Sequence, residues 1–139
     1  MIDSNMELYV ATNVASVFLV NVISDTYRLI RDSATTKNPH FESVMRKLDL
    51  EADLRVIEAL VKSDKPINEA QRLAIKNVSD MVGKIKGDLE KISRGIEYDM
   101  TRYLNSWRSP TYLDILKQME NHKKILDMRV TRLVQILSI

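Results

Sequence analysis

The chain contains no cysteine and only two histidines, and both shortages limit its chemistry. Without cysteine it can form no disulfide and no thiolate metal site, a composition that fits a reducing compartment such as the cytoplasm. Three glycines and three prolines among 139 residues leave little material for turns, and low-complexity tracts are absent. The composition therefore predicts a helical chain.

Catalytic motifs are also missing. His40 and His122 lie far apart in the sequence, and neither belongs to an HExxH motif or to a repeated Glu-x-x-His pair. Glu120 stands two positions before His122, a spacing that points the two side chains to different faces of a helix. There is no glycine-rich phosphate loop and no G-x-S-x-G motif. We expect no enzymatic activity, no cofactor, no metal and no catalytic residue.

Basic clusters of the kind that bind nucleic acid are not present either. Residues 1–70 carry a net charge of −3 and residues 71–139 a net charge of +5. The most basic stretches, "KIKGDLEK" and "NHKKILDMRVTR", are interrupted by acidic and apolar residues. Such stretches are more typical of a solvated helix face than of a recognition helix, so no nucleic-acid partner is expected.

The most apolar segment stands near the beginning of the chain, where Leu8 to Ser24 contain no charged residue. Three interpretations compete. A secretory signal would need a basic start, whereas Asp3 and Glu7 precede the segment. A stable transmembrane helix would need about twenty mainly apolar residues, and this run spans only about 26 Å as a helix. A buried core helix and a segment that later enters a membrane remain open.

Helical periodicity favours the core helix. One continuous stripe at spacings of three and four contains Leu8, Ala11, Ala15, Phe18, Val22 and Leu29. Further apolar residues lie off this stripe, among them Tyr9, Val10, Val17, Val20 and Ile23. A helix that is apolar on two sides is usually buried on two sides. The segment is therefore predicted to be the central helix of a bundle.

The rest of the chain predicts further helices. Residues 32–40 read as a loop, and a second helix runs from Pro39 to about Ser63, with an inner stripe that shifts between Leu48 and Leu50. Asn68 and Gln71 form a capping box that starts a third helix. Gly83 and Gly87 inside it are interpreted as tolerated glycines rather than as a site of close helix approach.

Gly95 is predicted to end the third helix. A short amphipathic helix follows, containing Ile96, Met100, Tyr103, Leu104 and Trp107. Ser109 and Pro110 then begin a last helix, whose apolar pattern continues to Ile139. We thus expect an all-α fold, a four-helix bundle with a short extra helix before the last helix. Residues 1–139 form a single domain, and the uncapped end suggests the N-terminal domain of a longer protein.

The order of these parts resembles a known family. A third helix ending "GDLEKISRG", a short helix with "TRYLNSW" and a last helix from "YLDILKQM" to "LVQIL" are similar to the four-helix domains of the HeLo and mixed lineage kinase domain-like family. The coiled-coil domains of plant helper immune receptors are related in the same way. The resemblance covers nearly the whole chain and rests on helix order and hydrophobic pattern.

The resemblance implies a cell-death effector of the necroptotic or immune kind. Such a domain is cytoplasmic, is held inactive by a regulatory partner domain or receptor, and on activation forms a homo-oligomer that permeabilises the plasma membrane with the help of anionic phospholipids. The candidates for membrane insertion here are Tyr9, Val10, Val14, Val17, Phe18, Val20 and Ile23. The candidates for lipid-phosphate binding are Arg28, Arg31, Lys84, Lys86, Lys91 and Arg94, of which the Lys84–Arg94 group is diluted by Asp88 and Glu90.

An alternative of another class stays open. A non-enzymatic helical bundle can also serve as a protein–protein interaction or assembly module, viral or part of a larger complex. Substitutions in the apolar first segment would then disrupt a protein partner instead of a membrane contact.

Overall fold

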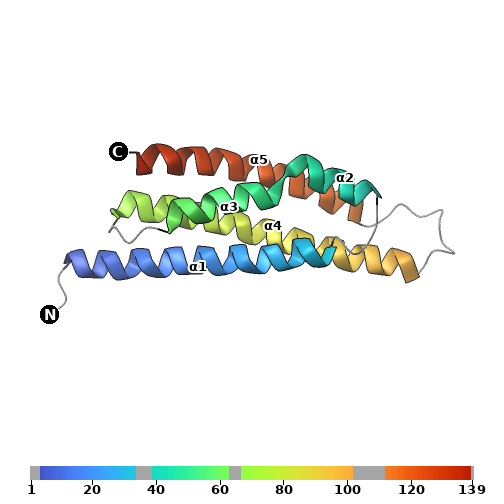
Figure 1. Cartoon of the computed structure of the whole chain (residues 1–139), viewed down its shortest axis with the longest axis horizontal. Helices are drawn as coiled ribbons and strands as arrows, with labels where there is room; N and C mark the ends of the chain where they lie inside the picture. Colours follow the sequence, from blue (N-terminus) through green and yellow to red (C-terminus); the bar gives the residue numbers. More distant parts are fainter. Residues whose placement is uncertain (1–3, 34–38, 63–66, 102–111, 139) are drawn as a thin grey trace.

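The computed structural model describes residues 4–33, 39–62, 67–101 and 112–138, and side chains at 14–33, 39–62, 67–95 and 113–138. Within these ranges the chain is all-α: α1 is Ser4–Ser33, α2 Pro39–Leu48, α3 Leu50–Val61, α4 Glu69–Thr101 and α5 Tyr112–Leu137. The predicted all-α bundle is confirmed, with α2 and α3 together taking the place of its second helix (Figure 1).

The helices alternate in direction. α1 and α4 run the same way, since Ser33 contacts Ser93 and Asp25 contacts Lys86, while α2, α3 and α5 run the opposite way (Figure 1). α4 packs along both α1 and α5, α3 contacts α1, and α2 contacts α5. This is the up-down-up-down arrangement of a four-helix bundle.

α4, rather than α1, contributes most to the core. Its buried residues are Ala74, Ile75, Val78, Ser79, Met81, Val82, Ile85, Asp88, Leu89 and Ile92. The prediction of a central first helix was therefore wrong: α1 lies along one side of α4 and keeps an exposed apolar face. A row of apolar residues shows that a helix face can be buried, but it does not say whether a neighbour covers it.

The inner face of α1 was assigned correctly only in part: Ala15, Val22 and Leu29 of the predicted stripe pack against the core. Leu19, Ile23, Thr26 and Ser33 are buried, whereas Phe18, predicted to face inward, is exposed. Thr26 and Ser33 each donate a hydrogen bond of 2.7 Å to the carbonyl four residues earlier, so their hydroxyls are satisfied inside the core. These two polar residues can therefore be buried. The hydrophobic pattern of the sequence counts only apolar residues, so it did not place them on the inner face.

The predicted second helix is two helices. Asp49 separates α2 from α3 with a φ of 49°, and its backbone N–H donates to the carbonyl of Met45 at 3.1 Å. This single bond and the left-handed residue form an αL termination of α2. Leu48 and Leu50 are two residues apart, and residues two apart on one helix lie on different faces. The shift of the apolar stripe between them therefore marks the point where α2 ends and α3 begins.

Other boundaries are partly as predicted. The capping box is confirmed: the Asn68 N–H donates to Gln71 Oε1 at 2.9 Å, and the Gln71 N–H donates to Asn68 Oδ1 at 2.8 Å. α4 does not end at Gly95 but continues through Ile96 and Met100 to Thr101. The remainder of the predicted short helix, with Tyr103, Leu104 and Trp107, and the predicted cap at Ser109 and Pro110 lie outside the described residues.

Candidate functional site

The predicted membrane-facing residues divide between the surface and the core. Val14, Val17 and Phe18 are exposed, with 63%, 50% and 59% of their surface accessible. Ile23 is fully buried, and Val20 packs against the core. The side chains of Tyr9 and Val10 lie outside the described residues. Three of the seven candidates thus form an outward apolar face on the first half of α1, which we call the α1 face.

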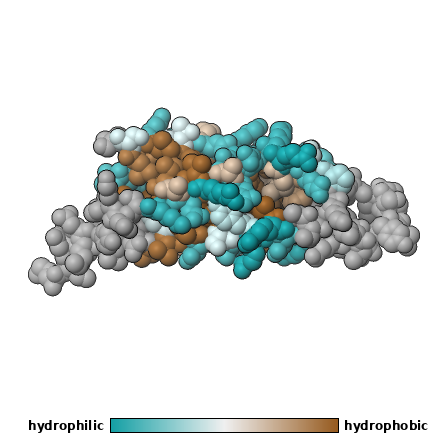
Figure 2. Space-filling view, in the orientation of Figure 1, coloured by the Kyte–Doolittle hydropathy of each residue, from teal (hydrophilic) through white to brown (hydrophobic). Residues whose placement is uncertain are grey.

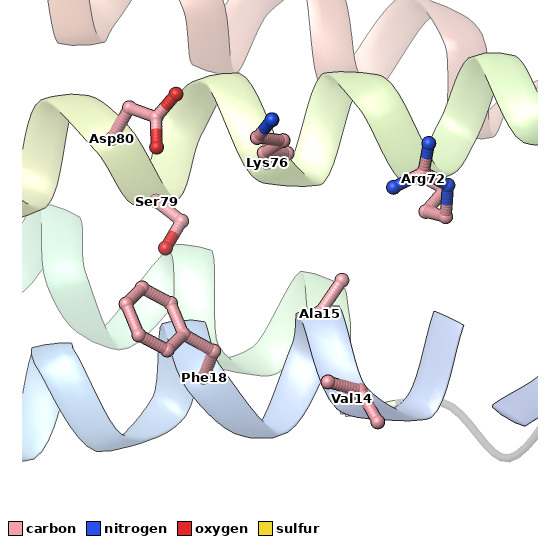
Figure 3. Close-up of a pocket in the computed structure, with 7 residues that line it drawn as sticks. All are labelled: Val14, Ala15, Phe18, Arg72, Lys76, Ser79 and Asp80. Carbon is pink, nitrogen blue, oxygen red and sulfur yellow. The ribbon is translucent and has the colours of Figure 1, made fainter. Parts of the chain in front are cut away.

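A groove of about 520 Å³ lies beside the α1 face, between α1 and α4 (Figure 3). Its α1 wall is apolar and its α4 wall carries polar and charged groups. The lining residues are Val14, Ala15, Phe18, Arg72, Lys76, Ser79 and Asp80. In Figure 3 the Ser79 hydroxyl points from α4 toward the ring of Phe18. The groove joins an apolar surface to cations within one site, and sequence reasoning missed it because α1 and α4 are distant in the chain.

The cations of the groove differ in their pairing. Arg72 donates to both carboxylate oxygens of Glu69, with an Nε–Oε2 distance of 2.9 Å. This hydrogen bonding lowers the pKa of Glu69 and raises the pKa of Arg72. Lys76 is exposed and makes no ion pair with another residue whose side chain is described. Lys76 is therefore the groove cation that is available to an anionic ligand.

The predicted lipid-phosphate residues do not form one patch. Arg28 and Lys86 both bind Asp25, at 3.2 and 3.3 Å, so a carboxylate already neutralises part of their charge. Lys86 also approaches Glu90 at 4.0 Å. Arg31, Lys84, Lys91 and Arg94 are exposed. Arg28 and Arg31 lie in the second half of α1 and the other four between residues 84 and 94 of α4, away from the α1 face.

A buried polar cluster joins α4 to α5. Asp88 is 2% exposed, accepts a hydrogen bond of 3.0 Å from Gln118 Nε2, and lies 2.5 Å from Nδ1 of His122. A carboxylate only accepts, so Nδ1 carries the hydrogen. Sequence reasoning missed this pair. The available signal was Asp88 itself, a carboxylate three positions after Ile85 and four before Ile92 in the inner stripe of α4.

A second buried charge joins α5 to α3. Lys123 binds Asp53 and donates a hydrogen bond of 2.7 Å to Asp127. Burial by itself lowers the pKa of Lys123, but the hydrogen bonds to the two carboxylates outweigh burial, and the pKa is raised. The Lys123 contact with Asp53 holds α5 against α3.

Tyr27 on α1 has a pKa raised first by burial and then by the charge of Glu58. No set of three or more His, Asp or Glu side chains that could bind a metal occurs among the described residues.

In the described part of the chain, no helix is both long and apolar enough to cross a membrane. A comparison of the sequence and structure with protein-family models, curated proteins and solved structures found no match.

Proposed function

We propose that this chain is a non-enzymatic helical bundle that binds anionic phospholipid membranes through the α1 face and permeabilises them as a homo-oligomer. The observation that carries the proposal is the exposure of Val14, Val17 and Phe18 on a stretch of α1 without any charge. Large apolar side chains that gather on one exposed face are typical of interaction sites. The family resemblance supplies the regulated cell-death context, in which a cytoplasmic bundle moves to the plasma membrane on activation.

The physical basis is the absence of charge on the face that would meet the membrane. Each square ångström of apolar surface removed from water contributes about 25 cal/mol, and no charged group on residues 8–24 has to be desolvated. Arg28 and Arg31, at the other end of α1, and Lys76 beside the groove can meet lipid phosphates, at about 1 kcal/mol for each cation near an anionic surface. Binding therefore combines an apolar wedge with peripheral cations.

In the proposed oligomer, α1 either keeps its contacts with the bundle or exchanges some of them. Leu19 and Ile23 hold α1 on the core, while Val14, Val17 and Phe18 are free to contact lipid without breaking those contacts. Binding at the surface thus needs no unfolding. Permeabilisation is the step at which the inner face would leave the bundle, with a regulatory partner domain or receptor controlling that release.

One observation favours the alternative, a protein–protein interaction or assembly module. α5 exposes Met128, at 69%, together with Ile125 and Val134, so the exposed apolar residues are not confined to α1. Figure 2 shows a hydrophobic area toward the end of α5 and a separate one along α1, with hydrophilic residues between them. Several separate apolar areas suit an assembly with more than one protein neighbour.

Dye release from liposomes with and without anionic lipid tests the proposal, with the wild-type chain compared to Val17→Glu. Val17 is half exposed, so a glutamate there should leave the helical circular dichroism unchanged and reduce leakage at least tenfold, because it places a charge on the α1 face. Val56→Glu is the matched control: Val56 is 56% exposed, but on α3 beside α5.

Leakage that is lost with Val17→Glu and retained with Val56→Glu supports the proposal. Equal leakage from both variants contradicts a role for the α1 face. Absence of leakage and of vesicle binding by the wild type contradicts the membrane function itself and favours the assembly module.

A further inference from the structure

The Ser79 hydroxyl differs from four other serine and threonine hydroxyls of the bundle in having no hydrogen-bond partner. Thr26, Ser33, Thr131 and Ser138 each donate to the backbone carbonyl four residues earlier, at 2.7 to 2.9 Å. Ser79 is only 3% exposed, and its Oγ has no hydrogen-bond partner. It points into the groove between α1 and α4 (Figure 3). A buried hydroxyl without a partner is costly, so a ligand oxygen at this place would be stabilised.

The walls of the groove indicate the remaining chemistry of such a ligand. The α1 wall, made of Val14, Ala15 and Phe18, offers an apolar surface. The volume of about 520 Å³ falls within the range of roughly 300–1,000 Å³ that is typical of small-molecule sites. An apolar chain of moderate length therefore fits the site better than a rigid polar molecule does.

The charges along α4 orient the ligand. Lys76 is exposed and unpaired among the described side chains, and Arg72 stands one turn before it. Asp80 lies at the other end, eight residues or about 12 Å along the helix from Arg72. An anionic group is therefore attracted to the Arg72–Lys76 end and repelled from the Asp80 end. Ser79 lies three residues, about 4.5 Å, beyond Lys76 along the axis.

We propose that this groove binds a monoacyl phospholipid, with its phosphate at Lys76, a glycerol or ester oxygen accepting from the Ser79 hydroxyl, and its acyl chain on Val14, Ala15 and Phe18. Lys76 and Ser79 share the α4 wall, and the apolar residues face them on the α1 wall, so the polar part of such a lipid meets α4 and its acyl chain meets α1. The inference rests on the proposed function in one respect, since it names a lipid class for the same region of α1. It concerns a single bound molecule rather than a membrane surface.

Isothermal titration calorimetry with lysophosphatidic acid, kept below its critical micelle concentration, tests this inference on the full chain without vesicles. We expect saturable binding of one molecule per chain. Lys76→Gln should raise the Kd about tenfold through loss of the charge contact, and Ser79→Ala by a similar factor through loss of the hydrogen bond. Lys124→Gln, which removes an exposed lysine of α5, and Ser138→Ala should leave the Kd unchanged.

Three further probes separate the parts of the ligand. Laurate keeps the chain and the charge but lacks the glycerol oxygens, so its weaker binding should be insensitive to Ser79→Ala. A monoacylglycerol lacks the phosphate and should be insensitive to Lys76→Gln. Inorganic phosphate lacks the chain and should not bind measurably. Phosphate binding as tight as that of the lysolipid, or a lysolipid Kd unaffected by both groove variants, would overturn the inference.

The two proposals fail in different ways. Leakage that depends on Val17, combined with no binding of monomeric lysolipid, overturns the groove assignment and leaves the membrane function in place. Lysolipid binding that depends on Lys76 and Ser79, combined with no leakage and no vesicle binding, supports the groove and contradicts the membrane function. Circular dichroism of each variant establishes that it is folded before either result is interpreted.

Discussion

Asp88 and His122 form a buried acid–histidine contact across the α4–α5 interface, and their removal should be costly. Replacing His122 with alanine leaves the Asp88 carboxylate buried, with Gln118 as its remaining side-chain donor. We expect His122→Ala to lower the free energy of unfolding by about 3 kcal/mol, since removing one partner of a buried hydrogen-bonded acid–base pair typically costs that much. Urea denaturation followed by circular dichroism measures the change.

His40 provides the matched control. It is exposed in the first turn of α2, so His40→Ala should change the free energy of unfolding by less than about 0.5 kcal/mol. A double-mutant cycle with Asp88→Ala should give a coupling of about 2 kcal/mol, as expected for a hydrogen bond to a charged group. If His122→Ala costs no more than His40→Ala, the contact does not contribute to stability in solution.

At the scale of the helix, Gly83 and Gly87 lower the stability of α4 without a structural benefit. A Cβ atom added at either position would meet no other atom within 4 Å, so neither glycine allows the close approach of a neighbouring backbone. Each glycine costs about 0.5–1 kcal/mol relative to alanine inside a helix. Gly83→Ala with Gly87→Ala should therefore raise the free energy of unfolding by about 1–2 kcal/mol, measured by urea denaturation. A decrease would mean that the sites are filled in solution.

The helices themselves were largely predictable, but their faces and junctions were not. Asn68 and Gln71 indicated the start of α4, and they make the expected reciprocal hydrogen bonds. The break between α2 and α3 at Asp49 was not predicted, because no glycine or proline stands there. Its only sign in the sequence is the shift of the apolar stripe between Leu48 and Leu50. An aspartate adopts the left-handed conformation more readily than most residues, so it can end a helix where the sequence contains no glycine or proline.

The candidate site could be predicted only in part, because burial depends on which neighbouring helix covers a face. Apolar residues occur on two sides of α1, so its sequence identified an apolar surface without saying which side would be covered. Val17 and Ile23 were both predicted to lie off the inner stripe, but Val17 is half exposed whereas Ile23 is fully buried. The groove depends on Lys76 and Ser79, which no pattern within α1 can locate. Contacts between distant helices require the bundle geometry.

At the scale of the molecule, the unequal packing of α1 and α4 should produce unequal stability. α4 lies between two helices, and its residues from Val78 to Leu89 include most of the core on that helix. The Val14–Phe18 segment of α1 is apolar but exposed on one side. Local opening of a segment costs less free energy when fewer buried contacts have to be broken. The α1 segment should therefore open without unfolding the rest.

Amide hydrogen exchange measures this difference. We expect the amides of Val78–Leu89 to exchange only through global unfolding, with a protection free energy equal to the free energy of unfolding in urea. The amides of Val14–Phe18 should exchange at least tenfold faster, through local opening. Equal protection of the two segments would contradict a detachable α1. A detachable first half of α1 is what a bundle needs if it is to transfer that helix from its own core to a lipid surface while α4 and α5 stay packed.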